Sequence, residues 1–332
     1  MTDRALGWGL LGTARINRNL IPALRASSGN KLVAVASRDA DRAAAYAREW
    51  GIERAYGSYQ ALLEDPAVDV VYVPLPNHLH AEWTVRAARG GKHVLCEKPL
   101  ALSVAEVEAI ERAARESSVA VAEAFMYRHH PQTLKLKQLV EEGAVGALRF
   151  LRGAFSFPLD RPDDYRFRPE CGGGCLWDVG CYPLSLLRLL AGREPVEVYG
   201  AAVLGPTGVD ETFACQLVFP GGVPAQIDAG FRSAVRAEVE VVGSDGVLRL
   251  RDPWRPSPGS PIELVRGGAV ETLATPPADR FLLEVEDLER AARGRDVPRI
   301  TLAESRGNVA TIAALLVSAR EGRPVRLGPA TP

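Results

Sequence analysis

Lysine, aspartate and tyrosine side chains can take part in delivering a proton to a carbonyl oxygen, and the candidates in this sequence are Lys98, Asp178 and Tyr182. Hydride transfer to a carbonyl leaves an alkoxide, so a proton donor must lie within hydrogen-bonding reach of the oxygen. A tyrosine phenol can donate this proton, and a lysine cation in a partly desolvated cleft stabilises the negative charge that develops. Asp178 lies four residues before Tyr182, so on a helix both side chains project from one face, where Asp178 is expected to hold Lys98 or a substrate hydroxyl. A solvated loop lysine, an acidic helix N-terminus and a packing aromatic are the structural alternatives.

A glycine turn near the start of the chain is a candidate phosphate site. In the segment GLLGTARIN, residues 9–17, an apolar run ends in a glycine and passes into a helical pattern. A strand, a glycine turn and a helix in this order cradle a pyrophosphate, because backbone N–H groups and the helix dipole both point at the anion. The segment departs from G-x-G-x-x-G: with Gly12 in the first position, Ala14 and Asn17 take the other two. A turn that binds no nucleotide is therefore the alternative.

The end of the next expected strand bears on which dinucleotide binds. An NAD site places Asp or Glu there to accept both ribose hydroxyls. This chain has Ser37 and Arg38 instead, and a hydroxyl with a guanidinium suits a 2′-phosphate. The sequence therefore favours NADP(H) over NAD(H). The alternative is a helix N-cap serine followed by a solvated arginine that pairs with Asp39 or Asp41.

Short apolar runs alternate with helical patterns in the first third of the chain, which is typical of parallel βα units. The run VDVVYV at 68–73 suits the centre of a sheet buried on both faces. We expect an α/β fold that begins with a doubly wound parallel Rossmann sheet over residues 1–123. The expected strands are 6–11, 31–37, 65–73, 93–96 and 119–122, and the expected helices are 16–25, 40–50, 79–89 and one that opens with a Ser103/Glu106 capping box.

The pattern changes after residue 123, where strands divided by turn residues predominate. The turns PGG at 220–222 and SDG at 244–246 predict hairpins. We therefore expect a C-terminal α+β domain over residues 124–332 with a large, mostly antiparallel sheet. Its expected strands are 148–157, 196–204, 212–219, 223–231, 237–242 and 247–251. Expected helices are 132–142, 176–190, 280–293 and 303–321, the last three packed on one side of the sheet, and the proline-rich stretch 252–261 is expected to be a surface loop.

Three segments resemble the Gfo/Idh/MocA family, which contains glucose-fructose oxidoreductase and inositol dehydrogenase. They are VPLPNHLH at 73–80, GKHVLCEKPL at 91–100 and GGGCLWDVGCYP at 172–183. A fourth, EAFMYRHHP at 123–131, is similar to the branch that holds xylose and dihydrodiol dehydrogenases and ketoreductases of nucleotide-linked deoxysugars. Many members have His where this chain has Tyr182, so the resemblance implies a proton donor of the tyrosine type and disfavours inositol-dehydrogenase-like chemistry.

The resemblance implies an N-terminal Rossmann domain and a C-terminal substrate-binding domain whose open sheet forms homodimers or homotetramers. It places Lys98 beside the nicotinamide and implies Lys98, Asp178 and Tyr182 as the catalytic residues. Cofactor contacts carry over to Gly12, Thr13, Ala14, Arg15, Ile16, Ser37, Arg38, Leu75, Asn77, His80, Glu97, Lys98 and Arg166. The substrate residues that we expect are Lys98, Tyr127, Trp177, Asp178 and Tyr182.

Composition and charge disfavour several kinds of partner. The chain has 332 residues, 40 basic and 41 acidic, and a net charge of −1, which leaves no basic excess for nucleic acid or an anionic membrane. No run approaches the roughly 20 apolar residues of a membrane span. Five cysteines without a recognisable secretory signal predict reduced thiols in the cytoplasm. Cys171, Cys175 and Cys181 lack the spacing of a common zinc site and have no histidine nearby, so no metal is expected.

The leading prediction is an NADP(H)-dependent oxidoreductase that interconverts a hydroxyl and a carbonyl on a sugar or sugar-like substrate. The segment FSFPLDRPDDYRFR at 155–168 mixes aromatic rings with arginines, which suits a nucleotide-linked sugar; an exposed loop with internal Asp–Arg pairs explains it equally well. A dehydrogenase of a free aldose or a cyclic diol is the alternative enzyme. A non-catalytic, dinucleotide-sensing regulator is the alternative of another class, and the presence of Lys98, Asp178 and Tyr182 argues against it, because a sensor needs no proton donor.

Overall fold

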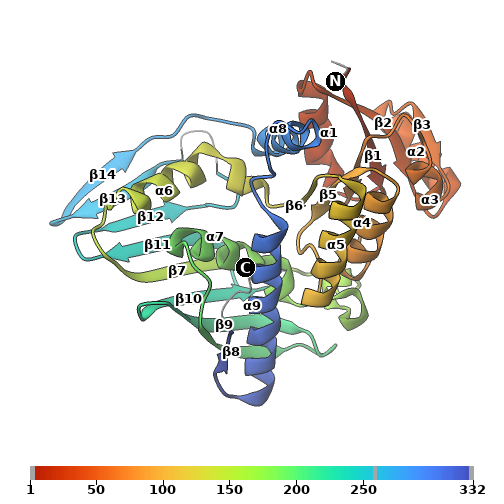
Figure 1. Ribbon diagram of the computed structural model, residues 1–332. Coiled ribbons are helices and arrows are strands. Elements are labelled where there is room, and N and C mark those ends of the chain that lie inside the picture. The colour runs from red at the N-terminus through yellow and green to blue at the C-terminus, as the bar shows by residue number, and fades with distance from the viewer. Residues whose placement is uncertain (1–3, 257–259, 329–332) are drawn as a thin grey trace. The chain divides into compact units, whose positions relative to one another are not determined.

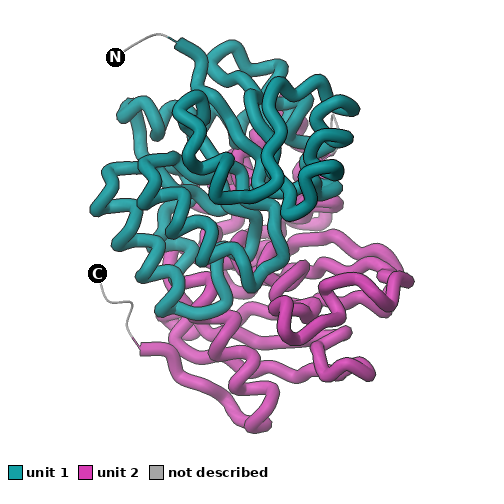
Figure 2. Tube along the Cα trace, turned by 90° about the vertical axis from the view of Figure 1, so that its right-hand side faces the viewer, with its two compact units in different colours: residues 1–126, 279–306 teal, residues 127–278, 307–332 magenta. Residues whose placement is uncertain are grey.

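The protein, for which the computed structural model describes residues 4–256 and 260–328, divides into two units (Figures 1 and 2). Unit 1 comprises residues 1–126 and 279–306, and unit 2 comprises residues 127–278 and 307–332. A cofactor-binding role for the first part of the chain and a substrate-binding role for the second stay predictions.

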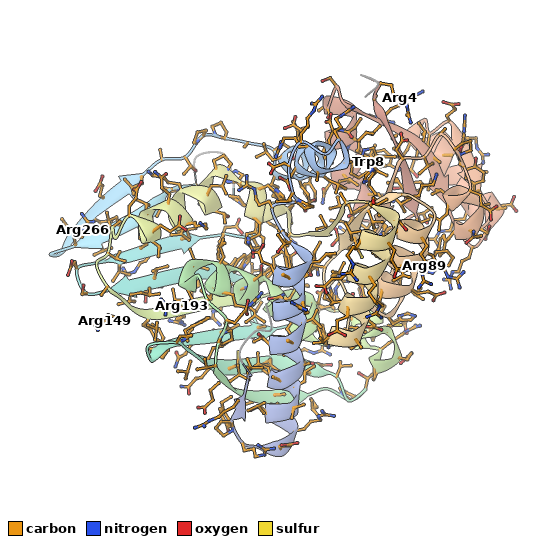
Figure 3. All side chains as sticks on the ribbon, in the orientation of Figure 1. Arg4, Trp8, Arg89, Arg149, Arg193 and Arg266 are labelled. Atoms are coloured by element: carbon orange, nitrogen blue, oxygen red, sulfur yellow. The ribbon has the colours of Figure 1, made fainter. Side chains whose placement is uncertain are left out.

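Unit 1 is built on a six-stranded parallel sheet with the strand order β3-β2-β1-β4-β5-β6. The strands are β1 (Leu6–Leu11), β2 (Asn30–Ala36), β3 (Arg54–Tyr56), β4 (Val70–Val73), β5 (His93–Glu97) and β6 (Val121–Ala124). Trp8 on β1 is fully buried, whereas Arg4 before it is exposed; both are labelled in Figure 3. Arg4 pairs with Asp69. The strand order reverses between β1 and β4, which is the point where such sheets bind ligands beyond the carboxyl ends of their strands. The predicted doubly wound Rossmann sheet is confirmed.

Helices follow most of these strands. They are α1 (Asn17–Ala26), α2 (Ala40–Trp50), α3 (Tyr59–Leu63), α4 (His80–Arg89) and α5 (Val104–Ser117). The predicted capping box at the start of α5 is confirmed: the Ser103 hydroxyl accepts from the Glu106 N–H, and the Glu106 carboxylate accepts from the Ser103 N–H. Strand β3 and helix α3 were not predicted, because their three and five residues are too short to show a period.

Helix α8 (Arg280–Ala292) comes from late in the chain but packs in unit 1 against α1, as Figure 1 shows. We expected this helix on the antiparallel sheet, and that prediction was wrong. Polar contacts between residues far apart in the chain join α8 and the residue after it to the start of β2. The Asn30 amide donates to Glu289 at 2.9 Å, and Arg293 donates to the carbonyl oxygen of Gly29 at 3.2 Å. An apolar stripe predicts that a helix is buried but does not say against which surface.

Unit 2 is built on a nine-stranded sheet with the order β14-β13-β12-β11-β7-β10-β9-β8-β15. Among the described residues, β7 and β10 pair in parallel and the other neighbouring strands pair antiparallel, so the predicted mostly antiparallel sheet is confirmed. The turns at 220–222 and 244–246 join β9 to β10 and β11 to β12, as predicted. The strands are β7 (Leu148–Ser156), β8 (Glu197–Leu204), β9 (Asp210–Phe219), β10 (Val223–Gly230), β11 (Arg236–Gly243), β12 (Val247–Arg251), β13 (Ile262–Arg266), β14 (Ala269–Leu273) and β15 (Val325–Arg326), of which the last three were not predicted.

The remaining α-helices of the described residues are α6 (Pro131–Glu141), α7 (Cys181–Ala191) and α9 (Leu302–Glu321). Helix α7 lies on β7, where a Cβ on Gly153 would come within 2.7 Å of Pro183; the glycine therefore lets the helix approach the strand. The segment Leu176–Gly180 before α7 is a π-helix, so the expected continuous helix over 176–190 is corrected. Of the helices within residues 4–256 and 260–328, none has both the length and the apolar character required to cross a bilayer.

The stretch 252–261 departs from the expected surface loop. Trp254 is fully buried, and its indole N–H donates to the carbonyl oxygen of Ala154 on β7 at 3.1 Å. The expectation is therefore wrong at Trp254, because a proline-rich composition marks irregular backbone but does not say which side chains are exposed. Residues 257–259 lie outside the described residues.

Candidate cofactor and substrate sites

The glycine turn lies at the carboxyl end of β1 and passes directly into α1. Gly12 has a φ of +110°, a conformation that side chains other than glycine rarely adopt, and its carbonyl oxygen accepts from the Asn17 amide at 2.9 Å. Within the described residues, no backbone oxygen accepts from the N–H groups of Thr13, Ala14, Arg15 or Ile16. Four free backbone donors at the start of a helix fit a pyrophosphate, since an anion there satisfies both the donors and the helix dipole.

A set of polar side chains gathers beyond β2, next to this turn. Ser37 is buried and Arg38 is exposed. The Arg42 guanidinium, in the first turn of α2, donates from Nε to the Thr13 hydroxyl at 2.7 Å. Within the described residues, Arg38 forms no ion pair with either aspartate that follows it, and one of these, Asp39, instead caps α2 by accepting from the Arg42 N–H. Two guanidinium groups are thus available near a hydroxyl, which suits a phosphate better than a ribose diol.

The carboxyl end of β4 carries the predicted cofactor contacts Leu75, Asn77 and His80. All three are buried, and Leu75 approaches the glycine turn, 3.3 Å from where a Cβ on Gly12 would lie. The two ring nitrogens of His80 lie 2.7 Å from the carbonyl oxygen of Pro99 and 2.6 Å from that of Leu75. Burial lowers the pKa of His80 to about 4. In this position the imidazole connects the turn after β4 with the turn after β5.

Glu97 and Lys98 follow one another at the carboxyl end of β5. The Tyr72 hydroxyl donates to Glu97 Oε1 at 2.5 Å, and the Lys98 N–H donates to Glu97 Oε2 at 3.3 Å. Lys98 is half-buried, and its peptide bond to Pro99 is cis. The Glu97 carboxylate is therefore held by a strand side chain on one side and by the lysine backbone on the other. This arrangement lies at the edge of the sheet where Rossmann folds bind their ligands.

In unit 2, Asp178 and Arg166 form a short ion pair. Arg166 donates from Nε to Asp178 Oδ2 at 2.7 Å, and its NH1 group lies 3.1 Å from Asp164. Burial alone would lower the pKa of the Arg166 guanidinium, but Asp178 and Asp164 together raise it above its ordinary value. The four-residue spacing between Asp178 and Tyr182 crosses from the π-helix into α7, so the one-face argument for a regular α-helix does not apply.

Tyr182 is enclosed by three aromatic rings of unit 2. Its ring stacks on Tyr127 with centroids 5.6 Å apart, and it meets Phe155 and Trp254 edge-on at 5.3 Å and 5.9 Å. The Tyr127 hydroxyl donates to the backbone oxygen of Tyr182 at 3.0 Å. Tyr182 is 8% exposed, whereas Tyr127 and Trp254 are fully buried. The surrounding rings leave the phenol ring of Tyr182 few alternative rotamers.

The predicted site residues fall into both units. The expected contacts from Gly12 to Lys98 lie in unit 1, while Arg166 and the expected substrate residues other than Lys98 lie in unit 2, with Trp177 buried on the π-helix. In the segment 155–168, Asp164 pairs with Arg161 at 3.1 Å as well as with Arg166. All five cysteines are free thiols, and the described residues contain no group of three or more His, Cys, Asp or Glu that could hold a metal ion.

Two candidate residues, Arg42 and Trp254, escaped the sequence analysis. One signal in the sequence could have identified Arg42 as a candidate phosphate ligand: it lies in the first turn of the helix that follows Arg38. No local signal marks Trp254, because its contacts with Tyr127, Phe155 and Tyr182 join residues far apart in the chain.

Comparison with known proteins bears on both units. Residues 6–125 match the model of an oxidoreductase family with an NAD-binding Rossmann fold, and residues 133–249 match the Gfo/Idh/MocA C-terminal domain. The chain is 40% identical over 325 residues to D-xylose 1-dehydrogenase (NADP(+)) 2 of Haloferax volcanii, covering 96% of this chain and 99% of that protein. It is 39% identical over 298 residues to the dTDP-3,4-didehydro-2,6-dideoxy-alpha-D-glucose 3-reductase of Streptomyces violaceoruber, covering 88% and 86%.

Among solved structures, the chain is similar to KijD10, a 3-ketoreductase from Actinomadura kijaniata in complex with NADP and TDP-benzene. The TM-score is 0.90 at 32% identity, over 95% of this chain and 98% of that chain. The same reductase has also been solved with a single tyrosine replaced by phenylalanine and with a single lysine replaced by alanine. The two matched family models together span more than half of the sequence. This chain therefore belongs to the Gfo/Idh/MocA oxidoreductase family.

Proposed function

We propose that the protein is an NADP(H)-dependent oxidoreductase that interconverts a hydroxyl and a carbonyl on a sugar or sugar-like substrate. The observation that carries the proposal is the glycine turn with four free backbone donors, in the same unit as Lys98 at the carboxyl end of β5. The first feature suits a dinucleotide and the second supplies a cation to the edge of the sheet where that dinucleotide is held.

Unit 1 holds the cofactor in this proposal. The N–H groups of residues 13–16 bind the pyrophosphate, and Ser37, Arg38 and Arg42 bind a 2′-phosphate. Leu75, Asn77, His80 and Glu97 line or support the nicotinamide end. The xylose dehydrogenase relative is named for NADP(+), and the similar ketoreductase was solved with NADP, which supports the choice of cofactor.

When bound, the nicotinamide supplies or accepts the hydride. Tyr182 donates its phenolic proton to the substrate oxygen during reduction and takes it back during oxidation. Lys98 stabilises the negative charge on that oxygen. The lysine and tyrosine replaced in the similar ketoreductase lie the same number of residues apart as Lys98 and Tyr182, which supports these two assignments. Asp178 orients Arg166, which we assign to the cofactor.

A nucleotide-linked keto-sugar is the substrate that we propose first. The dTDP-sugar reductase relatives support it, as do the exposed Arg161 and Arg168 beside the aromatic residues of segment 155–168. A free aldose is the second candidate, favoured by the 40% identity to the xylose dehydrogenase. Trp177, Tyr127 and Asp178 are the further residues that we assign to the substrate side, with Tyr127 acting through Tyr182 because it is fully buried.

We further propose a homodimer or homotetramer that forms through the sheet of unit 2. Tyr199 and Val203, four residues apart on one face of β8, have exposed large side chains. Next to them lies a shallow hollow of about 410 Å³ over β7 to β10, lined by side chains that include Arg152, Gln216 and Gln226. The five free thiols support the prediction of a reducing cytoplasm.

The test is NADPH consumption with a panel of keto-sugars, free and nucleotide-linked, and NADP(+) reduction with free aldoses. Tyr182→Phe should lower kcat by about 10²-fold or more with little change in cofactor affinity, because only the acid is lost. Lys98→Ala should lower kcat as well. Tyr56→Phe, which removes a phenol of β3 outside the residues assigned to the site, is the matched control. Turnover at the wild-type rate in Tyr182→Phe would remove the tyrosine from the mechanism. Cofactor binding without turnover on any panel member, unchanged by Lys98→Ala, would favour the sensor.

A further inference from the structure

We propose that Glu284 is a positioning residue of the cofactor site: it acts through Glu97, the residue before Lys98, and makes cofactor affinity depend on pH. This inference rests on the proposed function in one respect, because it takes unit 1 to bind the dinucleotide. Glu284 belongs to none of the motifs that mark the cofactor site in the sequence, and it reaches unit 1 on the late helix α8.

Glu284 lies on the buried face of α8 together with Phe281, Val285 and Leu288. Its side chain is 2% exposed. One of its carboxyl oxygens, Oε1, is buried without a hydrogen-bond partner. A carboxylate in such surroundings loses its hydration and gains no donor in return, whereas a neutral carboxylic acid tolerates the same place at a much smaller energetic penalty.

The charged neighbours of Glu284 are predominantly acidic. Glu97 at the end of β5 and Asp287 on α8 act on it as negative charges, and Arg280 on α8 acts as the positive one. Of the elements packed against α8, β6 contributes Glu123, which is buried and accepts from the Leu100 N–H at 2.9 Å. Helix α1 presents apolar side chains to the interior, and its two arginines, Arg18 and Arg25, are exposed.

Burial first, and then the negative charges of Glu97 and Asp287, raise the pKa of Glu284 well above its ordinary value of 4.5. Glu284 therefore keeps its proton at pH values where an exposed glutamate has lost its own. Glu97 is the better site for the charge, because it is half-buried and accepts from the Tyr72 hydroxyl and from the Lys98 N–H. The two carboxyl groups come from elements joined by one strand, because α8 contacts β6 and β6 pairs with β5, where Ala124 lies opposite Glu97.

Loss of the Glu284 proton changes this arrangement. A second carboxylate repels Glu97 and disturbs the hydrogen bond from the Lys98 N–H, so the turn that we assign to the nicotinamide end loses its orientation. Cofactor affinity should then fall as the pH rises through the pKa of Glu284. Glutamine has the shape of the protonated acid and cannot lose a proton, so Glu284→Gln should retain the affinity and remove this part of the pH dependence.

The decisive experiment measures the Kd of NADPH by fluorescence titration from about pH 6 to about pH 10. For the wild type we expect Kd to rise on the order of tenfold toward alkaline pH, the effect of one coupled ionisation. Glu284→Gln should lack that rise and match the wild type at low pH. Glu286→Gln, which removes the same charge from a half-buried position two residues along α8, is the matched control and should follow the wild type.

A second measurement uses the cofactor-free protein. The infrared spectrum of the wild type at neutral pH should contain the C=O band of a protonated, buried carboxylic acid, and Glu284→Gln should lack it. Glu97→Gln removes one of the two negative charges that raise the pKa of Glu284 and should shift the titration of this band to lower pH. The infrared measurement tests the protonation of Glu284 even if Glu284→Gln folds poorly, because the spectra of the wild type and Glu97→Gln are enough for the comparison.

The outcomes separate this inference from the proposed function. Binding of NADPH with the same pH dependence in the wild type and in Glu284→Gln would overturn the inference and leave the proposed function standing. Absence of the carboxylic acid band in the wild type would also overturn it. Failure of every variant and the wild type to bind NADPH at any pH would overturn the proposed function, and the role in cofactor positioning with it.

Discussion

Replacement of Arg38 or Arg42 by alanine should weaken NADPH binding and leave NADH binding nearly unchanged. Both side chains are exposed, and Arg42 already donates to the Thr13 hydroxyl at the edge of the glycine turn. A hydrogen bond to a charged group contributes about 1.5–3 kcal/mol, and solvent screening places exposed groups in the lower part of that range. We therefore expect a loss of about 1.5–2 kcal/mol for each substitution, which corresponds to a roughly 10- to 30-fold higher Kd for NADPH.

The assay is fluorescence titration of NADPH and NADH against the wild type, Arg38→Ala, Arg42→Ala and the control Arg48→Ala, whose exposed side chain lies in the last turn of α2. NADH lacks the 2′-phosphate, so its Kd should stay within about twofold in every variant. Higher salt should reduce the preference for NADPH in the wild type, because exposed charge pairs are screened. Equal losses of NADPH and NADH affinity, or a loss in Arg48→Ala as large as in Arg38→Ala, would refute the assignment to a 2′-phosphate.

Three further predictions concern other positions. Gly12→Ala should strongly weaken dinucleotide binding in calorimetric titration, because the φ of +110° is strained for alanine; wild-type affinity would contradict this. Trp254→Phe should lower the free energy of unfolding by about 2–3 kcal/mol in urea titration, because it removes a buried hydrogen bond and ring volume. Trp83→Phe, at a half-buried tryptophan, is the control for Trp254→Phe. An equal loss of unfolding free energy in the two variants would contradict this prediction. Folding raises the pKa of Glu284, so the unfolded chain loses this proton near pH 4.5 while the folded protein keeps it. Above pH 4.5 the free energy of unfolding therefore falls by about 1.4 kcal/mol per pH unit. The fall ends at the raised pKa of the folded state. Glu284→Gln lacks that fall, so its advantage over the wild type in urea titration should grow with pH, and a constant difference would show that Glu284 is ionised in the folded protein.

Most elements of unit 1, apart from β3, α3 and the placement of α8, were predictable because each satisfies a local rule. The apolar run of β4 is buried on both faces, and β1 and α2 have the predicted bounds. The capping box of α5 needs only Ser103 and Glu106, three residues apart. The antiparallel strands around the two predicted turns of unit 2 were predictable for the same reason, because a hairpin turn is also a local signal. The missed strands β13 and β14 follow the stretch with buried Trp254, where composition indicated a loop.

The candidate site was predictable only in part. Ser37, Arg38 and Lys98 stand at strand ends, and in a parallel sheet the carboxyl ends of strands mark the ligand-binding edge. Asp178 accepts from Arg166 at 2.7 Å in unit 2, a contact that the sequence did not predict, and its expected role toward Lys98 or a substrate hydroxyl stays a prediction. The enclosure of Tyr182 by Tyr127 and Trp254 could not be foreseen, because aromatic contacts across a sheet depend on register and on loops that return to it.

Helix α8 shows that contacts which the sequence does not predict matter for chemistry as well as for fold. Its amphipathic pattern requires burial, but the contact between Asn30 and Glu289 that accompanies its position joins residues 259 apart in the chain, and no local rule encodes such a contact. Docking of α8 in unit 1 then brings the Glu284 carboxyl under the influence of Glu97. A site inferred from motif residues alone therefore omits a carboxyl group that arrives with a distant element, although the motif residue Glu97 helps to raise the pKa of that group.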